Sequence, residues 1–186
     1  MNGTETDTSE DLLTRALAGE AAAFGMLVRT HQRSVYSLAL RMLSDRHEAE
    51  DLAQEVFLGL HRNLSSVESP AHLAFWLRKV TLNRAIDRLR REPRQTVSLE
   101  DAGSLVCDAT EQRDPLLQRR LRALLAQLPP AARAVMLLRY QEDLSPPEIA
   151  HALGLPLNTV KSHLRRSLTL LRQRWVGLHP SAGERE

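Results

Sequence analysis

The chain has 186 residues, 42 % of them hydrophobic, and a formal net charge of +2, which suits one ordinary domain or two small ones. No run approaches the roughly 20 apolar residues of a membrane-spanning helix, and the acidic segment 1–11 lacks the apolar centre of a secretory signal, so we expect a cytoplasmic protein without membrane insertion. The single cysteine, Cys107, excludes an internal disulfide framework and a four-cysteine zinc site.

The charged residues gather in separate stretches. Residues 45–55 carry five acids and one arginine, residues 75–94 carry seven bases and two acids, and residues 156–175 carry five bases and no acid. Two basic stretches are typical of contact with a polyanion, most simply a nucleic acid. The acidic stretch could serve a protein partner. Any one stretch could also be a solvated helix face.

Helix-forming residues dominate the chain, and apolar residues recur at helical spacing, so we predict an all-α fold. Four helices are expected first, at about 9–17, 21–43, 45–63 and 71–91. Ser9 is the expected N-cap of the first helix, and Gly19 follows its end. The segment 65–70 is expected to be a loop. Together these helices predict a domain over residues 10–92.

The helix pattern ends at Pro93, and the polar residues 93–114 predict a flexible linker. A second helical domain is expected over residues 115–175, followed by a tail at 176–186. Its first helix begins near Pro115 with one leucine stripe: Leu116, Leu117, Leu121, Leu124, Leu125 and Leu128. A second helix begins at Pro130, because proline fits the first helical position.

Residues 145–172, SPPEIAHALGLPLNTVKSHLRRSLTLLR, predict a helix-turn-helix. Ser145 and Glu148 have the spacing of a capping box, with Pro146 at the first helical position. Gly154 allows the sharp turn that ends this helix. Asn158 or Thr159 is then the expected cap of the second helix.

The second helix of this motif has two distinct faces. Its inner, apolar stripe comprises Val160, Leu164, Leu168 and Leu171. Its outer face carries cations and small hydroxyls, which suit bases and phosphates: Thr159, Lys161, Ser162, Arg165 and Arg166. A DNA major groove admits such a helix. We therefore predict DNA binding here, although a merely basic helical hairpin would have the same pattern.

Three segments together resemble the extracytoplasmic-function (ECF) group of sigma-70-type sigma factors, over roughly residues 10–175. HEAEDLAQEVFLGL (47–60) is similar to their core-polymerase-binding helix. FWLRKVTLNRAIDRLRR (75–91) is similar to the segment that melts and reads the −10 element. LSPPEIAHALGLPLNTVKSHLRRSLTLLR (144–172) is similar to the −35-reading helix-turn-helix. A helix-turn-helix alone is common, but all three segments in this order are specific to the family.

The first segment carries the expected polymerase contacts Asp51, Gln54 and Glu55. Asp51 and Glu55 are four residues apart and share a helix face, which suits a basic partner. The resemblance implies that this partner is core RNA polymerase, through the clamp helices of its β′ subunit, with the β flap as a further contact. His47, four residues before Asp51, leaves a metal site as an alternative.

The second segment and the loop before it carry the expected −10 contacts: Ser66, Glu68, His72, Arg78, Lys79, Asn83, Arg84, Arg88 and Arg91. By resemblance, the loop Ser66–His72 shapes a pocket for a flipped base, Asn83 contacts a base edge or the strand, and the cations hold phosphates. Trp76 is interpreted as a core residue rather than a stacking platform. The loop departs from the family pattern, because it lacks the usual glycine and aromatic residue and carries Pro70.

The leading hypothesis is a promoter-selecting polymerase subunit, without catalytic residues, cofactor or metal, and with promoter DNA and an anti-sigma protein as further partners. A second hypothesis is a stand-alone helix-turn-helix regulator, with residues 10–92 as a sensing or dimerising domain. A third is a nucleic-acid-processing enzyme that uses a divalent metal on Glu48, Asp51 and Glu55.

Overall fold

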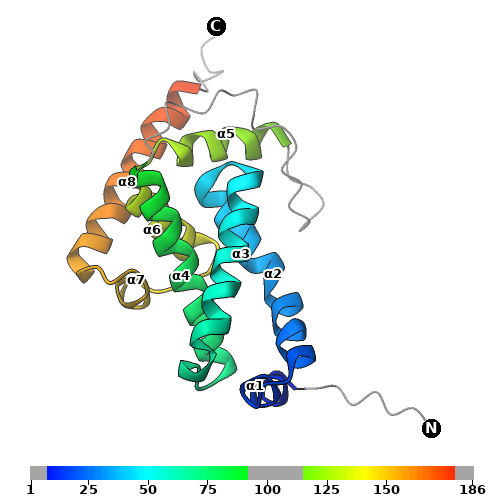
Figure 1. Ribbon diagram of the computed structural model, residues 1–186. Coiled ribbons are helices and arrows are strands. Elements are labelled where there is room, and N and C mark those ends of the chain that lie inside the picture. The colour runs from blue at the N-terminus through cyan, green and yellow to red at the C-terminus, as the bar shows by residue number, and fades with distance from the viewer. Residues whose placement is uncertain (1–7, 92–114, 179–186) are drawn as a thin grey trace, which may run out of the picture. The chain divides into compact units, whose positions relative to one another are not determined.

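The computed structural model describes residues 8–91 and 115–178, and every regular element there is a helix (Figure 1). The elements are α1 (Ser9–Leu17), α2 (Ala21–Leu43), α3 (Arg46–Asn63), the 3₁₀ turn η1 (Leu64–Ser66), α4 (Pro70–Arg91), α5 (Pro115–Ala126), α6 (Pro130–Tyr140), α7 (Pro146–Leu153) and α8 (Leu157–Leu178). The all-α class is confirmed. The chain divides into two compact units, but the division falls between Arg84 and Ala85, inside α4, so the predicted domain bounds 10–92 and 115–175 stay a prediction. The predicted linker 93–114, with Cys107, lies outside the described residues.

Capping side chains fix the starts of α1 and α3. The N-cap of α1 is Thr8, whose hydroxyl accepts a hydrogen bond from the Asp11 N–H at 3.3 Å, so the expectation of Ser9 as the cap is wrong by one residue. Asp45 caps α3 by accepting from the Glu48 N–H at 3.0 Å. Between α2 and α3, Ser44 has a left-handed φ of 59°, which lets the chain turn sharply.

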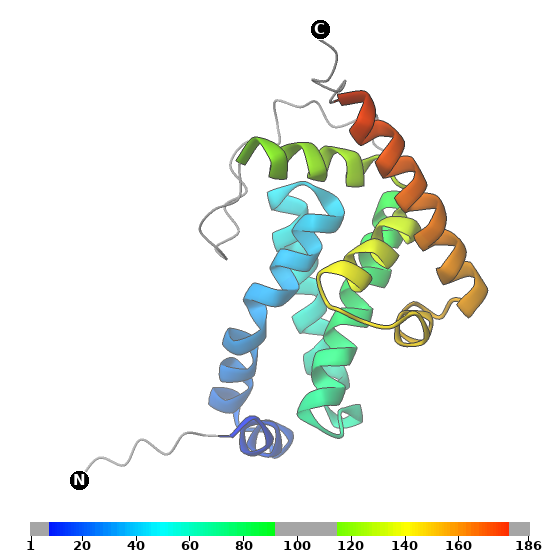
Figure 2. The same cartoon turned by 180° about the vertical axis from the view of Figure 1, so that it is seen from behind.

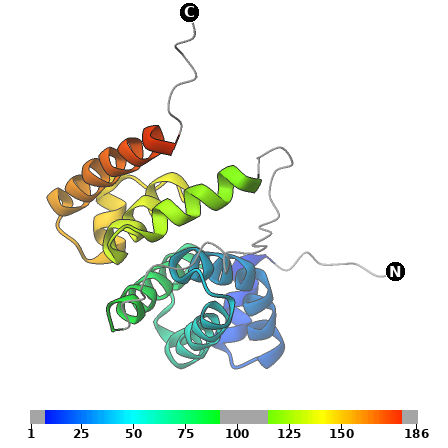
Figure 3. The ribbon, with the colours of Figure 1, turned by 90° about the horizontal axis from the view of Figure 1, so that it is seen from above.

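The N-terminal helices enclose one apolar core. Helices α2 and α3 lie side by side, and α1 crosses the start of α2; Figures 1 and 2 show this pair from opposite sides. The core contains large side chains with under 2 % exposure: Met42, Leu43, Leu52, Val56, Leu60, Val67, Leu73 and Leu82. Each such side chain contributes about 1.5–3 kcal/mol through burial. Figure 3 looks nearly along the axes of α2 and α3.

The C-terminal helices pack around α6, in which residues 132–138 are all buried. A cluster of Leu128, Ala132 and Met136 receives side chains from α8. The one charged residue in this buried run is Arg133, whose Nε donates to the Leu125 carbonyl at 3.1 Å and whose Nη2 donates to the Ala126 carbonyl. These bonds satisfy carbonyls that the end of α5 leaves unpaired. Burial lowers the pKa of the Arg133 guanidinium.

The leucine stripe predicted for α5 is only half buried. Leu124 and Leu128 are 6 % and 4 % exposed, whereas the first half of the stripe is open: Leu116, Leu117 and Leu121 are 63 %, 40 % and 44 % exposed. Only the C-terminal end of α5 reaches the cluster around Ala132. The spacing of the leucines was therefore a correct indication of a helix but not of its burial.

Candidate nucleic-acid interface

The turn between α7 and α8 has the predicted geometry. The Glu148 carboxylate accepts hydrogen bonds from the Ser145 backbone N–H at 2.7 Å and from the Ser145 hydroxyl at 2.5 Å, which fixes the start of α7. Gly154 ends α7 with a φ of +63°, a backbone conformation that residues with a Cβ rarely adopt. The Leu155 N–H then donates to the Ala150 carbonyl at 3.0 Å and closes the turn.

Helix α8 starts earlier than the sequence suggested. Its first residue is Leu157, and the Pro156 carbonyl accepts from the N–H groups of Thr159 and Val160 at 2.9 and 3.2 Å. Asn158 and Thr159 therefore lie within the first turn and do not cap the helix. The sequence misled because asparagine and threonine are preferred caps. At the other end, α8 continues to Leu178, past the predicted end at residue 175.

The two faces of α8 are as expected. Val160 is fully buried, and Leu164, Leu168 and Leu171 pack against the α5–α6 cluster. On the outer face, Lys161, Arg165 and Arg166 are exposed, while Thr159 and Ser162 are half-buried. Asn158 was expected only as a cap, and it is not among the predicted outer-face residues. It is exposed and precedes Lys161 by three and Arg165 by seven residues, which places it on the same face.

The loop before α4 is tied down by its own side chains. The Ser69 hydroxyl accepts from the His72 N–H at 3.1 Å, so Ser69 caps α4 and Pro70 takes the first helical position. Pro70, which departs from the family pattern, is therefore the first residue of α4. The Glu68 N–H donates to His72 Nδ1 at 3.3 Å, and the Ser66 hydroxyl donates to the Asn63 carbonyl at 2.7 Å.

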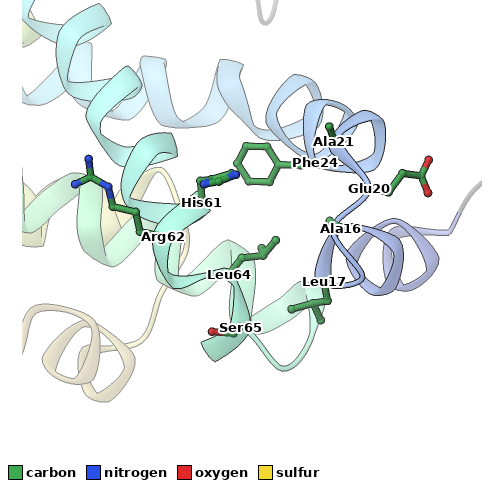
Figure 4. Close-up of a pocket in the computed structure, with 10 residues that line it drawn as sticks. Ala16, Leu17, Glu20, Ala21, Phe24, His61, Arg62, Leu64 and Ser65 are labelled. Carbon is green, nitrogen blue, oxygen red and sulfur yellow. The ribbon is translucent and has the colours of Figure 1, made fainter.

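A cavity of about 340 Å³ lies beside this loop, between the α1–α2 turn and the end of α3. Its lining is Ala16, Leu17, Gly19, Glu20, Ala21, Phe24, His61, Arg62, Leu64 and Ser65. Figure 4 shows Phe24 and His61 pointing toward each other, and their rings meet edge to face with centroids 5.1 Å apart. The expected loop residues Ser66–His72 do not line it.

The expected −10 contacts on α4 do not share one face. His72, Lys79 and Asn83 are separated by seven and four residues and form one stripe, on which all three are partly exposed. Lys79 Nζ lies 5.9 Å from the centroid of the Phe75 ring. Arg78 and Arg88 lie off this stripe and are partly exposed, and Arg91 is exposed in the last turn of α4.

Arg84 points toward α3. Its Nη1 lies 3.3 Å from Glu55 Oε2, which joins an expected DNA contact to an expected polymerase contact. Trp76 is half-buried beside Arg84. If Gly59 of α3 carried a Cβ, that atom would lie 3.6 Å from Cη2 of the Trp76 ring. The ring therefore packs against α3.

On α3, Asp51, Gln54 and Glu55 are all exposed, while the neighbouring apolar row of Leu52, Val56 and Leu60 is fully buried. Leu58 was missed by the sequence analysis. It is 59 % exposed and follows Gln54 by four residues, so an exposed apolar side chain lies beside Gln54. Within residues 8–91 and 115–178, no three or more His, Cys, Asp or Glu side chains are grouped to hold a metal ion. No helix of those ranges is long and apolar enough to cross a membrane.

Two family models match the chain: sigma-70 region 2 over residues 27–95 and sigma-70 region 4 over residues 118–171. The ECF RNA polymerase sigma factor SigW of Bacillus subtilis is 32 % identical over 168 residues, covering 83 % of this chain and 90 % of SigW. The RNA polymerase sigma-E factor of Streptomyces coelicolor is 34 % identical over 171 residues, covering 90 % of this chain and 96 % of that protein.

Two solved structures share the fold. One is CnrH in complex with the cytosolic domain of CnrY, with a TM-score of 0.63 and 23 % identity over 89 % of this chain and 96 % of that one. The other is the sigma factor RpoE with the anti-sigma factor NepR from Bartonella quintana, with a TM-score of 0.61 and 21 % identity over 81 % of this chain and 94 % of that one. The sequence relatives decide against the stand-alone regulator and the metal-dependent enzyme: the chain belongs to the ECF sigma factors of the sigma-70 family, non-enzymatic factors that direct transcription initiation by RNA polymerase.

Proposed function

We propose that this sigma factor binds core RNA polymerase through the exposed face of α3 and brings it to promoters that α4 and α8 recognise. The observation that carries the proposal is the outer face of α8. Lys161, Arg165 and Arg166 are exposed there in a capped helix-turn-helix, and no acid occurs between residues 156 and 175. Such a face attracts phosphates and suits base edges in a major groove.

The polymerase-binding face consists of Asp51, Gln54 and Glu55, with Leu58 as an apolar neighbour. Its partner is the clamp helices of the β′ subunit, and the β flap receives the second domain. An acidic and amide surface is complementary to a basic partner and favours rapid, oriented association. A central apolar side chain adds affinity because it leaves water on binding.

The −10 element is bound by α4 and the loop before it. Asn83 contacts a base edge or the exposed strand, with Ser66, Glu68 and His72 nearby in the loop, and Arg78, Lys79, Arg88 and Arg91 contact phosphates. Extruding a base costs a few kcal/mol, which contacts to the displaced base must offset. The stripe of His72, Lys79 and Asn83 supports a strand that runs along α4.

The −35 element is bound by Thr159, Lys161, Ser162, Arg165 and Arg166 of α8. The factor works in the cytoplasm, where polymerase and chromosome meet, and an anti-sigma protein holds it inactive. Support for that partner is the RpoE–NepR complex, in which a protein of the same fold is bound to an anti-sigma factor.

Run-off transcription with purified core polymerase tests the proposal. We expect initiation at particular promoters only when both this chain and core polymerase are present. Binding to operator DNA that needs no polymerase, without any core-dependent start, would contradict it.

A further inference from the structure

Arg84 connects the proposed −10 surface to the proposed polymerase surface. It belongs to α4, yet its Nη1 lies 3.3 Å from Glu55 Oε2 on α3. The two side chains are 40 % and 50 % exposed, so the pair lies at the surface, and half of Glu55 remains accessible to a partner. A phosphate that approached Arg84 would compete with Glu55 for the charge of the guanidinium.

A missing side chain on α3 makes room for the arginine. Gly59 is buried one turn after Glu55, and a Cβ built there would lie 3.3 Å from Arg84 Nη2 and 3.6 Å from Trp76 Cη2. The first distance is tighter than ordinary van der Waals contact. The guanidinium therefore lies over the bare backbone of α3, beside the indole of Trp76, and from there it reaches Glu55.

We propose that Arg84 is a positioning residue of the polymerase-binding surface and not a phosphate contact of the −10 surface. Its guanidinium holds the Glu55 side chain in one orientation before polymerase arrives. Ordering a long side chain at an interface costs about 0.5–1.5 kcal/mol, and an orientation that already exists avoids part of that cost. The inference rests on the proposed role of Glu55 in binding core polymerase.

A double-mutant cycle on core affinity tests the proposal. Labelled full-length Arg84→Ala, Glu55→Ala and the double variant are titrated with core polymerase, with circular dichroism as the control for folding. Because the pair is exposed, Arg84→Ala should weaken core binding about two- to fivefold. The same substitution should change nothing when Glu55 is already alanine. Arg90→Ala, which removes an exposed cation from the same helix, should leave core affinity unchanged.

Several outcomes would overturn the proposal. One is an equal effect of Arg84→Ala in both backgrounds, and another is tighter core binding, which would mean that the pair competes with polymerase. A third is a change in the salt dependence of promoter binding. If Arg84→Ala lowered the salt slope of the holoenzyme by about one unit, Arg84 would be a phosphate contact. If Glu55→Ala alone left core affinity unchanged, the α3 face itself would be wrongly assigned, which is a separate result.

Discussion

The exposed cations of α8 differ in how far they would reach into a DNA groove. Lys161 and Arg165 lie four residues apart on its exposed face, whereas Arg166 is turned further around the helix. Residues near the start of such a helix project deepest into the groove. We therefore predict that Lys161 or Arg165 contacts a base and that Arg166 mainly contacts a phosphate.

A scan of all −35 sequences with holoenzymes carrying each alanine variant, repeated at several salt concentrations, distinguishes these roles. Loss of a base contact should cost about 1–3 kcal/mol at one base pair, and loss of a phosphate contact should reduce the salt slope by about one unit. If neither Lys161→Ala nor Arg165→Ala changed the sequence preference, α8 would be wrongly oriented in the groove.

A second prediction for a single residue concerns Asn158. It lies in the first turn of α8, is exposed, and precedes Lys161 by three residues on the same face. An asparagine amide can pair with the N6 and N7 atoms of adenine. Asn158→Ala should therefore relax the preference for one A·T pair about five-fold or more, without changing the salt slope, because no charge is lost. The matched control is Thr169→Ala, which changes another exposed polar residue of α8, about three turns after Asn158. A uniform loss over all −35 sequences would contradict base contact by Asn158.

At the scale of elements, local sequence signals located most helices correctly. The predicted bounds of α2 agree with Ala21–Leu43, and the predicted Ser145–Glu148 box and Gly154 turn are present. These features depend on residues within four positions of one another, which a sequence displays directly. The Arg84–Glu55 pair joins residues 29 positions apart, so no local pattern indicates it. The open half of α5 was missed because periodicity does not reveal what covers a stripe.

Two glycines in helix interiors provide a matched comparison. Replacing a mid-helix glycine by alanine raises helix stability by roughly 0.5–1 kcal/mol. Gly25→Ala should realise this gain, because its Cβ would meet Arg29 Nη1 at an ordinary 3.6 Å. Gly59→Ala should gain less, because its Cβ would lie 3.3 Å from Arg84 Nη2 and the arginine must move. Urea denaturation of both variants measures the difference. An equal gain at both sites would mean that Arg84 yields without cost.

The exposed face of α3 allows a charge-matched test of polymerase binding. Asp51→Ala combined with Glu55→Ala should weaken core affinity while the fold stays intact, since exposed substitutions usually change stability within about 0.5 kcal/mol. Glu10→Ala combined with Asp87→Ala removes two exposed acids from α1 and α4, away from this face, and should have no effect. Core titration with circular dichroism measures both double variants. Equal losses from the two double variants would indicate a general charge effect instead of a defined contact.

For the whole molecule, the two proposed DNA surfaces lie in separate conserved regions of the family, sigma-70 region 2 over residues 27–95 and sigma-70 region 4 over residues 118–171. Joining two modest binding sites in one chain makes the second contact effectively intramolecular, so neither unit needs high affinity alone. The two surfaces also act at different stages. The major groove that α8 would enter is present in closed duplex DNA, whereas the strand that α4 would hold becomes accessible only after the base pairs open.

This order of events predicts how Asn83→Ala behaves in the holoenzyme. Asn83 is partly exposed on the α4 stripe, and its proposed partner exists only after strand separation. Closed-complex binding to duplex promoter should therefore remain near wild type, because the α8 contacts are intact. Formation of the open complex, followed by permanganate reactivity of unpaired thymines, should decline. A promoter with a pre-melted bubble should recover part of the loss, since the cost of opening has been removed. If the loss is equal on duplex and bubble templates, Asn83 does not act in the melting step, and a contact that persists after opening would have to explain its effect.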